Sequence, residues 1–297
     1  MKGNTFHIVD VFAESLYAGN QLAVVRDGHL FDDSQMQRIA KEFNFAETTF
    51  VRSEKAVDGA YDVRIFTPDR EIPFAGHPTL GTSWIIQQKI LNQEVEELTL
   101  ALKAGRVPVK FQYESGIPGD LWMHQLKPNF IGELQPDMLA DVLGIENDGI
   151  DDRFPVQEVS TGTPFIIVPV KDLATQKKIV VDIESHDALI ADTEAKAILT
   201  FCPETVDSSK QLNVRMFAPH YGVPEDAATG SANGCLAAYL AQNEYFGTSK
   251  VDVVVEQGLE IGRPSALKLR SDSSEGTIDV FVGGRVVEVA TGQLTKV

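Results

Sequence analysis

Val63-Arg-Ile-Phe-Thr-Pro68 begins a stretch that indicates the architecture, because the chain contains a second copy of it. The first copy continues at Ile72-Pro-Phe-Ala-Gly-His-Pro-Thr79. The second copy is Val214-Arg-Met-Phe-Ala-Pro219, which leads to Glu225-Asp-Ala-Ala-Thr-Gly-Ser-Ala232. Each copy reads as a strand, a turn with proline, and a glycine-containing loop that opens an apolar helix. Free backbone N–H groups at such helix starts bind anions. The repeat therefore predicts two related domains that face each other across a shared small-molecule cleft.

The composition limits the classes of function that the chain can have. A formal net charge of −17 argues against a nucleic-acid or anionic-membrane partner. The two cysteines, Cys202 and Cys235, predict neither a disulfide framework nor a zinc site, and the histidines show no metal-ligand spacing. The sequence shows no signal segment and no run of about 18 apolar residues that would span a membrane. We therefore expect a reduced, cytoplasmic protein.

Short strands and buried helices are expected along most of the chain. Segments rich in β-branched and aromatic residues predict strands at 6–12, 46–51, 61–66 and 251–256. An amphipathic helix is expected at 33–43, capped by Asp32 or Asp33, and an Asp-rich linker at 146–153. Two further helices, at 78–91 and 231–241, are apolar on nearly every face, which predicts burial all round. The pattern indicates an α+β fold of two pseudo-symmetric domains, each a β-barrel-like sheet wrapped around a central apolar helix.

Glu47 is the first candidate for chemistry. It lies in Phe45-Ala-Glu-Thr-Thr-Phe-Val51, where its neighbours are otherwise apolar or carry hydroxyl groups. Burial among such side chains raises the pKa of a carboxyl group, which suits it for general acid/base catalysis near neutral pH. The other interpretation places Glu47 on the exposed face of a strand, and the pattern does not separate the two.

The two helix-opening loops supply the remaining candidates. His77 and Asp226 are expected at matching places in the two copies, where they would converge and could move a proton or hold a substrate. Glu225 could replace Asp226 in that role. Thr229 and Ser231 add hydroxyl groups beside free N–H groups, although both can equally be ordinary helix caps.

Taken together, these residues resemble the PhzF family of phenazine-biosynthesis-like isomerases, which shares the fold of diaminopimelate epimerase. The resemblance runs nearly end to end, and its marks are Asp10-Val-Phe12, Gly19-Asn20, Ala23-Val-Val25, Glu47-Thr-Thr-Phe-Val51, Arg64-Ile-Phe-Thr-Pro68, Ala75-Gly-His-Pro-Thr79, Glu225-Asp226, Ala228-Thr-Gly-Ser-Ala232, Gln257-Gly258 and Gly262-Arg-Pro-Ser265. The chain departs from the usual family pattern at Gln21 and Ala227, where proline is common. Gln21 borders the expected cleft, so the substrate can differ from the phenazine precursor.

The resemblance implies the domain limits, the partners and the site. It implies an N-terminal domain at 1–127, to which a last strand at 286–297 returns, and a C-terminal domain at 128–285. It also implies a homodimer without metal or cofactor that acts on a small carboxylic acid, with Glu47 moving a proton between carbon atoms. His77 and Asp226 complete the predicted catalytic set, and the predicted substrate-binding residues are Asn20, Gly76, Thr229, Gly230 and Ser231.

Other functions stay open at this point. The epimerase relatives use one cysteine at each helix start, where this chain has Ala75 and Thr229. A two-cysteine racemase or epimerase is therefore the weaker enzyme hypothesis, beside a racemase or epimerase that works without cysteine. A non-catalytic protein that binds small acids on the same fold is the hypothesis from another class.

Overall fold

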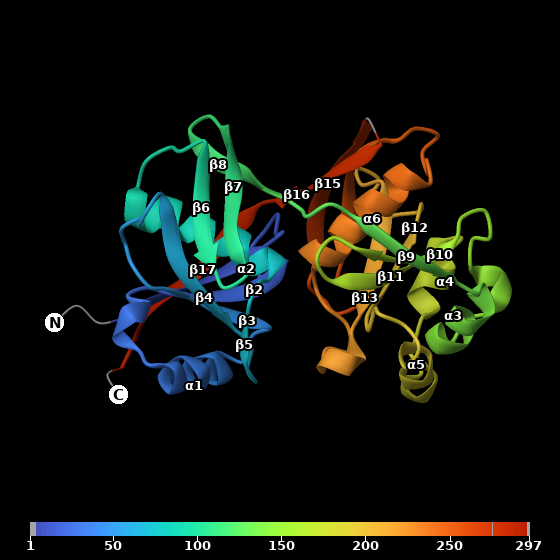
Figure 1. The fold of residues 1–297 in the computed structure, drawn as a ribbon, viewed down its shortest axis with the longest axis horizontal. Coiled ribbons are helices and arrows are strands. Elements are labelled where there is room, and N and C mark those ends of the chain that lie inside the picture. The colour runs from blue at the N-terminus through green and yellow to red at the C-terminus, as the bar shows by residue number, and fades with distance from the viewer. Residues whose placement is uncertain (1–3, 275, 296–297) are drawn as a thin grey trace. The chain divides into compact units, whose positions relative to one another are not determined.

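The chain forms two compact units in a computed structural model that describes residues 4–274 and 276–295 (Figure 1). Unit 1 takes the described chain up to Met123 and from Gly283 onward, and unit 2 is His124–Val282. The chain thus leaves unit 1, builds unit 2 as one continuous segment, and then returns. Residues 296 and 297 of the expected last strand lie outside the described residues.

The strands of unit 1 pair in one continuous series. The order is β17–β1–β2–β3–β4–β6–β7–β8, parallel at β2–β3 and β4–β6 and antiparallel at the other steps. The short strand β5 pairs with the end of β4. The bounds are β1 (Asn4–Val11), β2 (Asn20–Val25), β3 (Glu47–Val51), β4 (Ala60–Phe66), β5 (Glu71–Ile72), β6 (Glu97–Leu102), β7 (Gly105–Glu114), β8 (Ile117–His124) and β17 (Val286–Leu294).

Unit 2 repeats this series with its own strands. The order is β9–β10–β11–β12–β13–β14–β15, parallel at β11–β12 and β13–β14 and antiparallel elsewhere. Each step has the same direction as its counterpart in unit 1, with β9 in the place of β17. The pseudo-symmetry predicted from the sequence repeat is therefore confirmed. The bounds are β9 (Asn129–Leu134), β10 (Val156–Ser160), β11 (Pro164–Pro169), β12 (Ile198–Cys202), β13 (Leu212–Phe217), β14 (Lys250–Gln257), β15 (Ser265–Ser274) and β16 (Thr277–Gly284).

One apolar helix lies inside each unit, as predicted. Helix α2 (Gly76–Ile85) packs against β1, β2, β3, β6, β7 and β17, and α6 (Gly230–Gln242) packs against β10, β11, β14 and β15. A Cβ atom at Gly81 would lie 2.6 Å from a methyl group of the Leu22 side chain, so a larger residue there would force side chains of the sheet to shift. The predicted helix at 78–91 differs at its end, because the chain widens there into a π-helical turn at Ile86–Leu91, closed by a bond from the Asn92 N–H to the Gln87 carbonyl.

The other helices lie outside the two sheets. Helix α1 (Asp33–Phe43) has the predicted bounds, because Asp32 and Gln35 form a capping box at its start. The other helices are α3 (Pro136–Leu143), α4 (Leu173–Lys178) and α5 (Ile183–Ile190), with 3₁₀ turns at Gly28–Leu30, Asn147–Gly149 and Pro219–Tyr221. Within the described ranges, no helix combines the length and the apolar character needed to cross a membrane.

The predicted linker at 146–153 is wrong. This segment lies within unit 2, where Ile150 belongs to the hydrophobic core. Asp151 is buried and accepts two bonds from the Arg153 guanidinium, at 2.8 and 2.6 Å. Its acidic composition suggested exposure, but a charged side chain can be buried when a partner satisfies it.

Candidate active site

Glu47 and His77 lie together in unit 1. Glu47 begins β3, and His77 is the second residue of α2, which packs against β3. The His77 Nε2 atom lies 3.2 Å from the Glu47 Oε2 atom, and the two side chains are only 7% and 17% exposed. A hydrogen bond of 2.8 Å between the buried hydroxyls of Thr49 and Thr82 holds the helix to the strand beside them. The carboxyl group therefore has a fixed imidazole neighbour in a nearly dry setting.

Burial keeps the His77 ring neutral. It lowers the pKa of His77 to about 3, although a hydrogen bond to the Gln21 backbone favours the charged ring. The bond to Gln21 uses the proton of the neutral ring, since a backbone carbonyl can only accept. This assigns the Nε2 lone pair to the side that faces Glu47. The site in unit 1 therefore has a neutral imidazole beside a carboxyl group, with 3.2 Å between His77 Nε2 and Glu47 Oε2.

Asn20 belongs to the same part of unit 1. It is buried at the start of β2, directly before Gln21, whose backbone bonds to His77. The preceding Gly19 has a φ of +67°, and a Cβ atom there would clash with the Val11 carbonyl. Leu22 of β2 pairs with Glu47 of β3. The tight turn at Gly19 therefore places Asn20 two residues before the partner of Glu47 in β2.

Gly76 is the first residue of α2 in unit 1, and the other remaining predicted residues lie together in unit 2. The Asp226 Oδ2 atom accepts a bond of 2.5 Å from the Thr229 hydroxyl, and Oδ1 accepts one of 3.0 Å from the Ala227 N–H. Thr229 occupies the N-cap position of α6 but makes no cap bond with its side chain. Its hydroxyl is turned to Asp226, so the interpretation of Thr229 as an ordinary cap is wrong. Gly230 and Ser231 form the first turn of the helix.

The expected match between His77 and Asp226 is also wrong. The two central helices begin at Gly76 and Gly230, so His77 corresponds to Ser231, the second helical residue. Asp226 lies before the helix, in the loop. The structure places His77 beside Glu47 within unit 1, and Asp226 belongs to unit 2.

The arginines of the repeat carry a feature that the sequence analysis missed. Arg64 binds Glu71 through two bonds of 2.8 and 3.0 Å, and Arg215 binds Glu225 through two of 2.9 and 2.7 Å. Each guanidinium also lies over the phenylalanine two residues later in its strand, at 5.0 and 4.8 Å. We call these two arrangements the arginine forks.

The arginine fork of unit 2 excludes the alternative role that was predicted for Glu225. Both of its carboxylate oxygens bind Arg215, so it is not available to replace Asp226. In unit 1 the Arg64 guanidinium lowers the pKa of Glu71. Each fork ties the loop before a central helix to the strand before that loop. The signal was present in the sequence, because an arginine and a glutamate recur at the same places in both copies.

The cysteines are placed where they cannot act as a catalytic pair. Cys202 lies in β12 and Cys235 inside α6, and both are buried. Burial raises the pKa of Cys202 to about 12 and that of Cys235 to about 11, which keeps both as thiols. The N-cap positions of the central helices are Ala75 and Thr229. Two-cysteine chemistry is therefore not supported.

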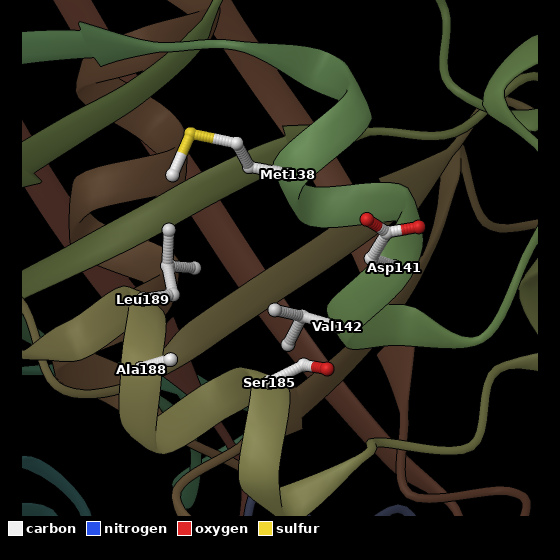
Figure 2. A pocket seen from close by; sticks show the side chains of 6 residues that line it. All are labelled: Met138, Asp141, Val142, Ser185, Ala188 and Leu189. Carbon is white, nitrogen blue, oxygen red and sulfur yellow. The ribbon is translucent and has the colours of Figure 1, made fainter.

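Hollows on the surface lie away from these residues. One, of about 280 Å³, lies between α3 and α5 of unit 2, with Met138 and Leu189 on opposite sides (Figure 2). Another, of about 360 Å³, is lined by residues 133–136 and 152–156. Neither is lined by a predicted site residue. In the described part of the chain, no group of three or more His, Cys, Asp or Glu side chains could hold a metal ion.

Two units, each with a sheet around a buried helix and the same strand order, define the diaminopimelate epimerase-like class of fold. A hydroxyproline epimerase from Agrobacterium vitis has this fold, with a TM-score of 0.60, 10% identity, and coverage of 98% of this chain and 92% of that one. The chain belongs to the PhzC-PhzF family of phenazine biosynthesis-like proteins, whose pattern it matches over residues 9–292.

Relatives with isomerase names are similar over almost their whole length. A trans-2,3-dihydro-3-hydroxyanthranilate isomerase from Pseudomonas aeruginosa is 33% identical, with 96% of this chain and 97% of the relative covered. An uncharacterised isomerase from Bacillus subtilis is 30% identical, with 94% of each chain covered. A PhzF-family protein from Bacillus anthracis has a TM-score of 0.90 and 28% identity, with both chains fully covered. The chain is therefore an enzyme of the isomerase class.

Proposed function

We propose that this enzyme moves a proton between two carbon atoms of a small carboxylic acid without a cofactor, with Glu47 as general acid and base. The acid is expected to be cyclic and to carry an amino or hydroxy group. The observation that carries the proposal is the contact of 3.2 Å between Glu47 and the neutral His77. Glu47 would take a proton from one carbon, the double-bond electrons would shift, and Glu47 would deliver a proton to another carbon after exchange with solvent. Substrate and product then have the same formula.

The other predicted residues have binding roles in this proposal. His77 and Asp226 bind and orient the substrate, and its carboxylate meets the helix starts at Gly76 and Gly230. Asn20, Thr229 and Ser231 complete the binding set. The proposal draws on residues of both units, which we propose to be two domains of common origin. A homodimer and a cytoplasmic location follow only from the family resemblance and the composition, and stay predictions.

The experiment follows proton movement directly. The probe is trans-2,3-dihydro-3-hydroxyanthranilate, the compound in the name of the Pseudomonas relatives, incubated in D₂O and followed by NMR. We expect deuterium to arrive on a ring carbon with the wild type. Glu47→Gln should lower kcat about 10²–10⁴-fold, which is the usual contribution of one general acid/base. Glu42→Gln, at an exposed position of α1, is the control and should keep full activity.

Two results would count against parts of the proposal. If Glu47→Gln keeps its activity, another group moves the proton. If the wild type binds the compound but no deuterium enters it, the result supports a protein that binds this compound without catalysing its isomerisation. If the wild type neither binds nor turns over the compound, the substrate assignment fails, and the same D₂O experiment is repeated on other small cyclic acids.

A further inference from the structure

We propose that Gln257 is a positioning residue, which fixes the Thr229 hydroxyl on Asp226 and so holds Asp226 as a hydrogen-bond-accepting carboxylate. Gln257 is the last residue of β14 and is fully buried. It lies outside the helix-opening loop that contains Asp226 and Thr229. The inference rests on the proposed function only in that Asp226 is there a substrate-binding group.

The Gln257 amide makes four contacts, three with the loop residues Asp226 and Thr229 and one with Asn233 of α6. Its Nε2 atom donates to the Asp226 carbonyl at 2.9 Å and to the Thr229 hydroxyl at 3.3 Å. Its Oε1 atom accepts from the Thr229 N–H at 3.3 Å and from the Asn233 Nδ2 atom at 2.8 Å. A side-chain amide has two N–H donors and two acceptor lone pairs, so this one is saturated.

The orientation of the amide follows from its partners. A flipped amide would point its N–H groups at the Thr229 N–H, and its oxygen at the Asp226 carbonyl. Both contacts would then join like groups, so only the observed orientation satisfies the network. Since the Thr229 hydroxyl accepts from Gln257, its single proton is directed to the Asp226 Oδ2 atom, at 2.5 Å. Gln257 thus donates a hydrogen bond to the Thr229 hydroxyl, and that hydroxyl donates to Asp226.

The packing around Gln257 keeps this chain of bonds in place. Asn233 also donates to the Thr229 carbonyl, at 3.0 Å, so that Thr229 is held from α6 as well as from β14. The next residue, Gly258, has a φ of +77°, and a Cβ atom there would lie 2.5 Å from the Ala227 carbonyl. The end of β14 is therefore in close contact with the loop, and a shift of Gln257 would displace the backbone of Asp226 as well.

These hydrogen bonds favour the negatively charged form of Asp226. Both of its carboxylate oxygens accept hydrogen bonds, from Thr229 and from the Ala227 N–H. Bonds of this kind favour the charged form of a carboxyl group and oppose its use as a proton donor. In the proposed reaction Asp226 would then hold a donor group of the substrate, such as an amine or a hydroxyl, and Glu47 alone would carry the transferred proton.

A double-mutant cycle on the ligand-free protein tests this. The variants are Gln257→Leu, Thr229→Val and the pair, and the readout is the Asp226 pKa from carboxyl-carbon NMR. Each single change should raise that pKa by about one unit, since each weakens or removes the hydrogen bond from Thr229 that favours the charged carboxylate. The pair should raise it no further than Thr229→Val alone, because Gln257 acts through Thr229. Thr229→Ser, which keeps the hydroxyl, should behave as the wild type.

Several outcomes would overturn the proposal. An unchanged Asp226 pKa in folded Gln257→Leu would do so, and so would effects of the two changes that simply add. If Gln257→Leu does not fold, Gln257→Met replaces it, because it keeps the length of the side chain and removes the amide donor to Thr229 without adding a charge. We then expect the Asp226 pKa to rise as in Gln257→Leu. Gln242→Met, at the exposed end of α6, is the matched control and should leave the Asp226 pKa unchanged. None of these measurements needs a substrate, so their failure is distinct from failure of the proposed reaction.

Discussion

A carboxyl group near a buried histidine favours the charged ring, whereas burial favours the neutral ring. At His77 the effect of burial is the larger. The pKa falls to about 3 even though a hydrogen bond to Gln21 opposes the fall. The neutral His77 ring therefore places no positive charge of its own beside the Glu47 carboxyl group, 3.2 Å away.

This neutrality makes stability depend on pH. An unfolded histidine takes up a proton below about pH 6.5, whereas folded His77 does so only near pH 3. Between these values the unfolded state binds more protons, so the contribution of His77 is fully present above pH 6.5 and is lost as the pH falls. The slope is up to about 1.4 kcal/mol per pH unit. Urea unfolding of the wild type and of His77→Gln between pH 7.5 and 4.5 should show a steeper loss in the wild type, and equal slopes would contradict the neutral ring.

For single residues, the sequence indicated which residues belong to the candidate site better than it indicated which side chains contact each other. Glu47 and His77 could be chosen because a carboxylate in an apolar strand and a histidine at a helix start are unusual. Their contact could not, since it depends on how α2 sits against β3. Gln257 was seen only as part of a family motif, because its role comes from four contacts made after folding.

At the scale of elements, the arginine forks fix the loops that lead into the central helices. The fork in unit 2 is the more buried, with Arg215 7% and Glu225 10% exposed, against 18% and 22% for Arg64 and Glu71. Arg215 also donates to the carbonyls of Gln176 and Ile179, at 2.9 and 3.0 Å, and so ties α4 to the same strand. Burial and the additional bonds indicate that this fork contributes more to stability.

Replacing each arginine by lysine tests that ranking. Lysine keeps the charge but cannot form the paired bonds of a guanidinium. We expect Arg215→Lys to lower the free energy of unfolding by about 2–4 kcal/mol, and Arg64→Lys by about 1 kcal/mol or less. Urea denaturation of both variants at pH 7 gives the comparison. The ranking would be refuted by an equal or larger loss for Arg64→Lys.

Element bounds were predictable where local chemistry sets them. Asp32 and Gln35 cap α1, and its predicted range is correct. The π-helical turn after α2 and the burial of Asp151 were not predicted, although the bonds at both places are local: Asn92 to the Gln87 carbonyl, and Arg153 to Asp151. The alternation of parallel and antiparallel pairs in each sheet has no local signature.

At the scale of the whole molecule, both units use the same series of strand pairs, but unit 1 completes its series with a distant strand. In unit 2, β9 pairs with the strand that follows it in the chain. In unit 1 the same place is taken by β17, which pairs with β1 along the whole strand, from Asn4 with Leu294 to Val11 with Val286. Unit 1 therefore depends on residues that follow all of unit 2.

Truncation after Gly284 tests this dependence. The shortened chain lacks β17, so β1 loses one of its two neighbouring strands. We expect hydrogen exchange at the amides of unit 1 to approach unfolded rates, whereas those of unit 2 keep their protection. Retained protection of β1 in the truncated chain would show that the last strand is dispensable.

The late position of β17 also sets an order of events during synthesis. Ribosomes add about 5–20 residues per second, and domains generally fold in the order in which they emerge. Here unit 1 cannot be completed before unit 2, because β1 must wait for its partner strand β17. Unit 2 closes in the meantime. For tens of seconds the nascent chain would expose an unpaired β1 edge, the kind of surface that recruits other strands, so the newly made protein is most prone to aggregation just before its last strand is released.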